Sequence, residues 1–253
     1  MSIAGIIPAR YSSSRFPGKP LAMIDGKSMI QRVYEQACKC HTLNSVIVAT
    51  DSQVIYSHVT DFGGKVVMTS EKHHSGTERC HEALVKEEKK GNEFDVIVNI
   101  QGDEPFIDPM QIEQVADLFQ NKKVQIGTLL KTITDKTQRN DPNTVKAIKN
   151  KNNEALYFSR ATIPFQREKD LESSKTETIF YKHIGIYGYR SSILKQLVKL
   201  PIGMLEQAEA LEQLRWLEHG FKINIDLTES DTQGIDTYDD ILRIAQKQKN
   251  KRP

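Results

Sequence analysis

Residues 6–20, IIPARYSSSRFPGKP, decide the fold of this chain. They end an apolar strand, which Pro8 breaks, and continue into a loop of small and rigid residues. The loop carries three cationic side chains, Arg10, Arg15 and Lys19. In an α/β chain such a loop lies at the carboxyl edge of the sheet, where ligands bind in open sheets. Because Arg and Lys donate charge-assisted hydrogen bonds to phosphate oxygens, the loop predicts a polyphosphate site.

The loop matches neither of the two familiar glycine-rich phosphate loops. A P-loop requires G-x-x-x-x-G-K-[ST], but here Gly18-Lys19 is followed by Pro20 and position 13 is Ser. The dinucleotide pattern G-x-G-x-x-G is also absent. Side-chain cations must therefore replace the backbone amides that hold phosphate in those loops.

The composition excludes several classes of protein. With 35 Lys and Arg against 33 Asp and Glu in 253 residues, the charge is nearly balanced, which argues against a general nucleic-acid coat. No apolar run is long enough to cross a bilayer, so we expect no membrane insertion. Three cysteines without metal-binding spacing indicate reduced thiols in a cytoplasmic protein.

Apolar strand patterns alternate with helical patterns along the chain, which predicts an α/β fold with a mainly parallel sheet and helices on both faces. The pattern changes after residue 132, where residues 145–148 and 155–158 read as a hairpin. Residues 166–178 are charged and aperiodic and predict a mobile surface loop. The strand predicted at 183–189 places His183 and Tyr187 on one face, and leucine periodicity predicts a helix over residues 204–219.

Two aspartates are candidates for a metal site. Asp103 comes just after the apolar strand at residues 95–100, hence at the ligand-binding edge, and a carboxylate there would hold Mg²⁺ against a phosphate loop. The alternative is a turn role in Gly-Asp-Glu-Pro. Asp236 precedes a capped helix that begins near residue 238, and is a candidate for a second metal carboxylate.

The segment HHSGTER, residues 73–79, opens a helix and allows two interpretations. Ser75 and Glu78 have capping-box spacing, so a structural role accounts for both. The same helix start also offers amides and hydroxyls to a polar ligand. Spacing alone favours the cap, although it does not explain Thr77 and Arg79.

Seven segments in order over nearly the whole chain resemble the family of 3-deoxy-manno-octulosonate (Kdo) cytidylyltransferases. They are IIPARYSSSRFPGKPL, HHSGTER, VNIQGDEP, ALYFSRATIP, KHIGIYGYR, LEQLR and GIDT. Phe16 and Phe165 stand where we expect Leu and Trp, and both keep apolar character. The resemblance implies a Rossmann-like nucleotide-diphosphosugar transferase fold, with residues 1–253 as a single domain. Residues 140–190 would form a subregion for dimer contact and the sugar pocket.

The resemblance also implies the activity and its site residues. The reaction would be CTP plus Kdo giving CMP-Kdo and pyrophosphate, for lipopolysaccharide synthesis, with Mg²⁺ and a homodimer. Residues matching the nucleotide site are Arg10, Arg15, Lys19, Ser75, Gly76, Thr77, Arg79 and Gln101. The catalytic residues would be Arg10, Lys19, Asp103 and Asp236, the last two as metal ligands. The residues matching the sugar pocket are Arg160, His183, Tyr187, Glu212 and Gln213.

We expect the anomeric hydroxyl of Kdo to attack the α-phosphorus of CTP directly, with Arg160 and His183 receiving the sugar carboxylate. Two alternatives stay open. In the first, the substrate is another acid sugar, 8-amino-Kdo or sialic acid. In a different class, a non-catalytic module would bind nucleic acid through the loop at residues 10–19, but acids follow two of the strands and no basic stripe is interleaved with aromatics.

Overall fold

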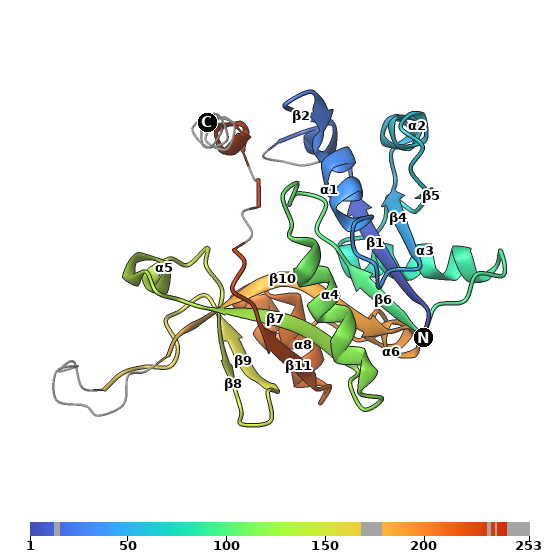
Figure 1. Cartoon of the computed structure of the whole chain (residues 1–253). Helices are drawn as coiled ribbons and strands as arrows, with labels where there is room; N and C mark the ends of the chain where they lie inside the picture. Colours follow the sequence, from blue (N-terminus) through green and yellow to red (C-terminus); the bar gives the residue numbers. More distant parts are fainter. Residues whose placement is uncertain (13–15, 168–178, 232–233, 236, 242–253) are drawn as a thin grey trace.

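The centre of the protein is a nine-stranded sheet, seen in a computed structural model that describes residues 1–12, 16–167, 179–231, 234–235 and 237–241 (Figure 1). The strands of this sheet are β1 (Ile3–Ala9), β4 (Ser45–Thr50), β5 (Val66–Met68), β6 (Val96–Asn99), β7 (Ile126–Thr132), β8 (Lys146–Lys149), β9 (Ala155–Ser159), β10 (Tyr181–Arg190) and β11 (Ile223–Leu227). A separate two-stranded ribbon is formed by β2 (Met23–Ile24) and β3 (Lys27–Ser28).

The strand order is β11-β7-β10-β6-β1-β4-β5, with β8 paired to β10 and β9 paired to β8. Along this path only β10 is antiparallel to its neighbours, β6 and β7. The pairs β1–β4, β1–β6, β4–β5 and β7–β11 are parallel. The prediction of a mainly parallel sheet is confirmed, and so is the antiparallel hairpin, which is β8 and β9.

The helices are α1 (Met29–Ala37), α2 (Gln53–Asp61), α3 (Gly76–Glu88), α4 (Pro109–Asp117), α5 (Lys136–Asn140), α6 (Ser191–Leu197), α7 (Met204–Glu209) and α8 (Glu212–Glu218). Short 3₁₀ turns occur at Lys19–Leu21 and Leu118–Gln120. None of the helices in the described part of the chain has the length and apolar character that a bilayer crossing needs.

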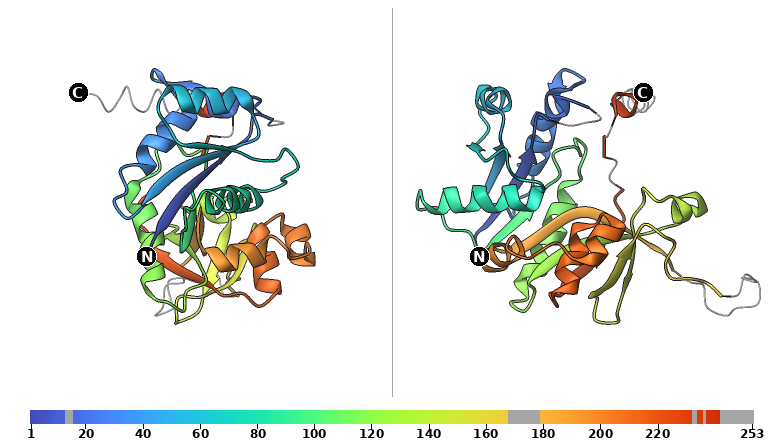
Figure 2. Two further views of the ribbon diagram at one scale, coloured as in Figure 1. Left: turned by 90° about the vertical axis from the view of Figure 1, so that its right-hand side faces the viewer. Right: turned by 180° about the vertical axis from the view of Figure 1, so that it is seen from behind.

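Both faces of the sheet are covered, which explains why the strands are continuous apolar runs (Figure 2). In β1, Ile7 belongs to a core cluster with α1, α2 and α4, whereas its neighbour Ile6 belongs to the cluster with α3, α6 and α8. Successive side chains of a strand point to opposite faces. An uninterrupted apolar pattern is therefore what burial on both faces requires.

The prediction of one helix over residues 204–219 is wrong. Ala210 lies in the left-handed region, with φ 50° and ψ 50°, and separates α7 from α8. Leu205 and Leu214 still pack against the same core cluster on either side of the break. The leucine periodicity thus continues across the turn at Ala210 and does not reveal it.

Candidate functional site: two cavities that share a wall

The carboxyl edge of the sheet brings together segments that are far apart in the sequence. The loops after β1, β4 and β6 all leave at this edge because these strands are parallel. The start of α3 follows β5 at the same edge. Since β10 runs the opposite way, its beginning, with His183, lies at this edge too.

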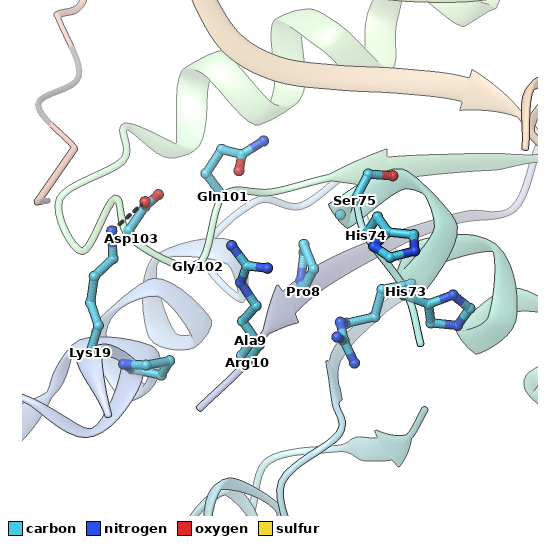
Figure 3. A pocket seen from close by; sticks show the side chains of 13 residues that line it. Pro8, Ala9, Arg10, Lys19, His73, His74, Ser75, Gln101, Gly102 and Asp103 are labelled. Carbon is cyan, nitrogen blue, oxygen red and sulfur yellow. Dashed lines mark hydrogen bonds and ion pairs between the residues drawn. The ribbon is translucent and has the colours of Figure 1, made fainter. Parts of the chain in front are cut away.

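The first cavity, of about 270 Å³, lies between the loop after β1, the start of α3 and the loop after β6 (Figure 3). Its lining includes six of the eight residues predicted to bind the nucleotide, Arg10, Lys19, Ser75, Gly76, Arg79 and Gln101. Asp103 and the imidazoles of His73 and His74 line it as well. In the close-up, Arg10 lies between the Lys19–Asp103 pair and the His73–Ser75 segment. The cavity is therefore rich in cations and hydrogen-bond donors, as a phosphate site requires.

Lys19 and Asp103 form an ion pair in this cavity, with Nζ 2.7 Å from Oδ2. The Lys19 side chain is 14% exposed and the Asp103 side chain 35% exposed. The Asp103 carboxylate thus lies at a point where a cation balances its charge. An oxygen ligand in this position suits Mg²⁺, which binds proteins through one or two carboxylates and takes its other ligands from water and phosphate.

A second prediction for the metal site concerns Asp236, which lies outside the described residues, as does Arg15. The residue before it, Ile235, is buried, and its backbone N–H donates to the Asp103 carbonyl at 3.0 Å. The segment next to Asp236 is therefore hydrogen-bonded to the backbone of Asp103. Within the described ranges, no cluster of three or more His, Cys, Asp or Glu side chains is placed to hold a metal.

Glycine at position 102 lets the loop after β6 pack against the end of β1. A Cβ atom on Gly102 would lie 2.7 Å from the Pro8 carbonyl oxygen, which is closer than real Cβ contacts. Glycine is needed here because there is no room for a side chain, and not because of the φ angle. Close approach of these two loops sets the distance between Arg10 and Asp103 across the cavity.

The start of α3 confirms the capping interpretation and also forms part of the wall of the first cavity. Ser75 Oγ accepts from the Glu78 N–H at 3.2 Å and the reciprocal bond is present, so the capping box exists. Ser75 and Gly76 nevertheless line the first cavity. Thr77 is not among the residues that line this cavity, and its hydroxyl donates to Glu212 Oε2 at 2.7 Å.

Arg79 is buried, and two side chains accept hydrogen bonds from its guanidinium. One nitrogen donates to Asp51 Oδ2 at 2.6 Å and another to Thr69 Oγ1 at 2.6 Å. Asp51 was not predicted as a site residue, although it directly follows the apolar strand at residues 45–50. The reasoning that identified Asp103 after β6 would also have identified Asp51 after β4.

A second cavity, of about 450 Å³, adjoins the first and shares Gly76 and Gln101 with it. The residues that line it include four of the five predicted for the sugar, His183, Tyr187, Glu212 and Gln213, with Thr77, Asn99 and Tyr189. The Gln101 amide donates to the Gly185 carbonyl at 2.8 Å, so the shared residue also fixes β10 against the loop after β6.

Burial dominates the electrostatics of this second cavity. It raises the pKa of Glu212, which the Thr77 hydroxyl lowers in part, and it raises the pKa of Tyr187. Burial also lowers the pKa of His183 to about 3, so this imidazole is neutral near pH 7. The Asn99 amide oxygen and the Tyr187 and Tyr189 hydroxyls are buried without a hydrogen-bond partner among the described residues.

Arg160 is not among the residues that line either cavity. Its guanidinium donates to the backbone carbonyls of Glu209 (2.8 Å) and Pro142 (3.1 Å), and more distantly to that of Ala210, which does line the second cavity. Buried Lys146 donates to the Arg160 carbonyl at 2.5 Å. Arg160 is thus placed beside the second cavity, in a framework of backbone acceptors.

Comparison with known proteins agrees with this geometry. A family model described as Cytidylyltransferase matches residues 4–223. A 3-deoxy-manno-octulosonate cytidylyltransferase of Parabacteroides distasonis is 53% identical over 245 residues, which covers 95% of this chain and 96% of that protein. An 8-amino-3,8-dideoxy-manno-octulosonate cytidylyltransferase of Shewanella sediminis is 47% identical over 243 residues, 95% of this chain and 96% of that protein.

A solved structure of a CMP:2-keto-3-deoxy-manno-octonic acid synthetase complexed with CTP superposes with a TM-score of 0.90 at 38% identity. The superposition covers 99% of this chain and 100% of that one. The resemblance drawn from the seven sequence segments is therefore confirmed, together with the fold it implied. The chain belongs to the cytidylyltransferase family.

Proposed function

We propose that this protein transfers CMP from CTP to 3-deoxy-manno-octulosonate and releases pyrophosphate. The observation that carries the proposal is the pair of adjoining cavities, one lined by cations and one by buried polar side chains, with Gly76 and Gln101 in both. A triphosphate in the first would place its α-phosphorus near the shared wall. The names of the relatives in the comparison support the choice of nucleotide and sugar.

In the first cavity Arg10 and Lys19 bind the phosphates, with Arg15 as the third predicted cation. A nucleoside triphosphate carries about four negative charges, and an acid sugar adds another, so the approach of the two substrates is repulsive. The cationic side chains offset this repulsion and stabilise the charge that develops on the pyrophosphate leaving group.

Asp103 and Asp236 are the residues that we propose would hold Mg²⁺. When bound, the ion supplies charge neutralisation on the phosphate oxygens. The part played by the chain is to keep the Asp103 carboxylate at the cavity, through the close packing of Gly102 on Pro8 and the bond from the Ile235 N–H.

In the second cavity Glu212, Gln213, His183 and Tyr187 bind the sugar acid, with Arg160 at its rim. The anomeric hydroxyl gives up its proton to water and its oxygen forms a bond to the α-phosphorus of CTP, while the bond from that phosphorus to the pyrophosphate oxygen breaks. Transfers of this kind depend mainly on positioning and charge stabilisation, so no covalent intermediate with the enzyme is required.

The test is a pyrophosphate-release assay that combines each of four nucleoside triphosphates with Kdo, 8-amino-Kdo and sialic acid, with and without Mg²⁺. We expect turnover with CTP and Kdo in the presence of Mg²⁺. A preference for 8-amino-Kdo would favour the second candidate substrate, which the Shewanella relative supports. No turnover with any acid sugar would contradict the proposal.

We also propose a cytoplasmic homodimer that serves lipopolysaccharide synthesis, with residues 140–190 in the dimer contact. The hairpin of β8 and β9 projects from the sheet (Figure 1), and Leu156 on it is 56% exposed. Sedimentation of the wild-type chain should give twice the chain mass, and Leu156→Asp should give the single mass. Val54→Asp, at an apolar side chain of α2 that is 59% exposed, should leave the dimer intact. A monomeric wild-type chain would contradict the proposal.

A further inference from the structure

Thr128, a fully buried residue of β7, lies where β10 changes register against β7, between Ile184 and Tyr187. Its hydroxyl oxygen is 2.7 Å from the Ile186 carbonyl oxygen and 3.3 Å from the Ile184 carbonyl oxygen. The same hydroxyl is 3.0 Å from Nε2 of His183. One hydroxyl thus contacts three groups of the irregular strand.

The hydroxyl has only one proton, and this decides how the contacts are made. A carbonyl oxygen can only accept. If the Thr128 proton pointed at His183, the hydroxyl oxygen would face the Ile186 carbonyl at 2.7 Å with lone pairs on both sides, which is repulsive. The proton is therefore donated to Ile186, and the hydroxyl oxygen accepts from Nε2–H of His183.

We propose that Thr128 is a positioning residue that holds His183 in the Nε2–H tautomer and so presents Nδ1 as an acceptor for a hydroxyl group of the sugar acid. This rests on the proposed function of the second cavity, which His183 lines. A carboxylate offers no proton to Nδ1. His183 is therefore assigned to a substrate hydroxyl, and the expectation that it receives the sugar carboxylate is replaced.

The surroundings of His183 agree with a neutral acceptor. The rings of Phe158 and Tyr187 flank the imidazole, each with its centroid 5.1 Å from that of the imidazole. His183 forms no ion pair with any described residue. A neutral imidazole has one nitrogen that donates and one that accepts, and the partner of the first fixes the role of the second.

The first test needs no substrate. Ring-nitrogen NMR spectra of the full chain, with the His183 signals assigned by comparison with His183→Gln, should show a protonated Nε2 and an unprotonated Nδ1. Thr128→Ser keeps the hydroxyl and should retain this pattern, whereas Thr128→Val should shift it towards the Nδ1–H form. An Nδ1–H tautomer in the wild-type chain would overturn the proposal.

The second test is a comparison of Michaelis constants in the pyrophosphate-release assay. Thr128→Val should raise KM for the sugar acid by about tenfold, because the loss of one hydrogen bond weakens binding by about that factor. KM for CTP should stay unchanged. Thr128→Ser should restore the wild-type value, which a general packing defect would not predict. An unchanged KM for the sugar acid in Thr128→Val, despite the Nε2–H tautomer in the wild type, would overturn the role of Nδ1. Absence of wild-type turnover would instead overturn the proposed function, while the NMR result stands by itself.

Discussion

The Lys19–Asp103 ion pair joins the loop after β1 to the loop after β6 at the cationic cavity. Sequence reasoning assigned both residues to the site because each follows a buried strand. It could not show that they contact each other, since the distance depends on how closely Gly102 packs on Pro8. Under the proposed function, the same lysine would contact both the Asp103 carboxylate and the phosphates.

Lys19→Ala should weaken the binding of CTP. The variant loses a charge-assisted contact to phosphate, which corresponds to a rise in KM for CTP of about 10- to 100-fold. Lys27→Ala is the matched control, because Lys27 lies in the same part of the chain but pairs with Glu35 and does not line the cavity. Equal KM values for CTP in the two variants would show that Lys19 does not bind the triphosphate.

Glu82 gives a prediction that depends on pH. Burial alone raises its pKa, but hydrogen bonds from Lys86, the Ser70 N–H and His73 lower it overall, from an ordinary value of 4.5 to about 2. A lowered carboxyl pKa stabilises the fold above the unfolded value and loses that effect as the pH falls through the folded value. Glu82→Gln should therefore lower the free energy of unfolding by about 1–2 kcal/mol at pH 7, allowing for solvent screening, and the difference should vanish between pH 4.5 and 2.

Chemical denaturation at several pH values measures this difference. Glu93→Gln, at an exposed position just after α3, is the control and should leave the free energy of unfolding unchanged. A destabilisation by Glu82→Gln that stayed constant from pH 7 to pH 2 would mean that its charge is not the cause.

At the scale of elements, the strands with both faces covered were predictable because their apolar runs have no other explanation, as β4 and β6 show. The break at Ala210 was not, because apolar residues recur at every third position from Leu205 to Leu217, on both sides of the break. The irregularity in β10 was predictable in part, because Gly185 and Gly188 indicate a crowded or bent strand at residues 183–189. Where the register changes depends on pairing with β7. In the sequence, Thr128 is likewise an ordinary β-branched strand residue, and only its position beside β10 shows a further role.

The loop after β6 offers a test of how elements set site geometry. Gly102→Ala places a Cβ 2.7 Å from the Pro8 carbonyl oxygen and should push Gln101 and Asp103 away from Arg10. A displacement of this size should lower kcat/KM by about 100-fold.

Gly234→Ala is the control for this prediction. Gly234 precedes Ile235 near the same loop, and a Cβ there would meet no atom of the described residues within 4 Å. We expect Gly234→Ala to keep its activity and both variants to stay folded by circular dichroism. Full activity in Gly102→Ala would show that the close packing does not position the site.

At the scale of the whole molecule, the order of the strands explains why one site forms from segments near residues 10, 76, 101 and 183. Parallel strands deliver the first three to one edge, and the reversed β10, inserted between β6 and β7, brings the fourth. The parallel part follows from the alternating pattern of the sequence. The insertion of β10 does not, because nothing in residues 181–190 specifies its neighbours.

The central claim is that Asp103 and the cationic loop act on one nucleotide with a bound metal ion. Its most direct test is the initial rate of pyrophosphate release from CTP and Kdo over a range of Mg²⁺ concentrations, for the wild-type chain and Asp103→Asn. We predict a saturable dependence on Mg²⁺ in the wild type and a rate lowered by at least about 100-fold in the variant. A near-wild-type rate in Asp103→Asn, with the same dependence on Mg²⁺, would contradict the account.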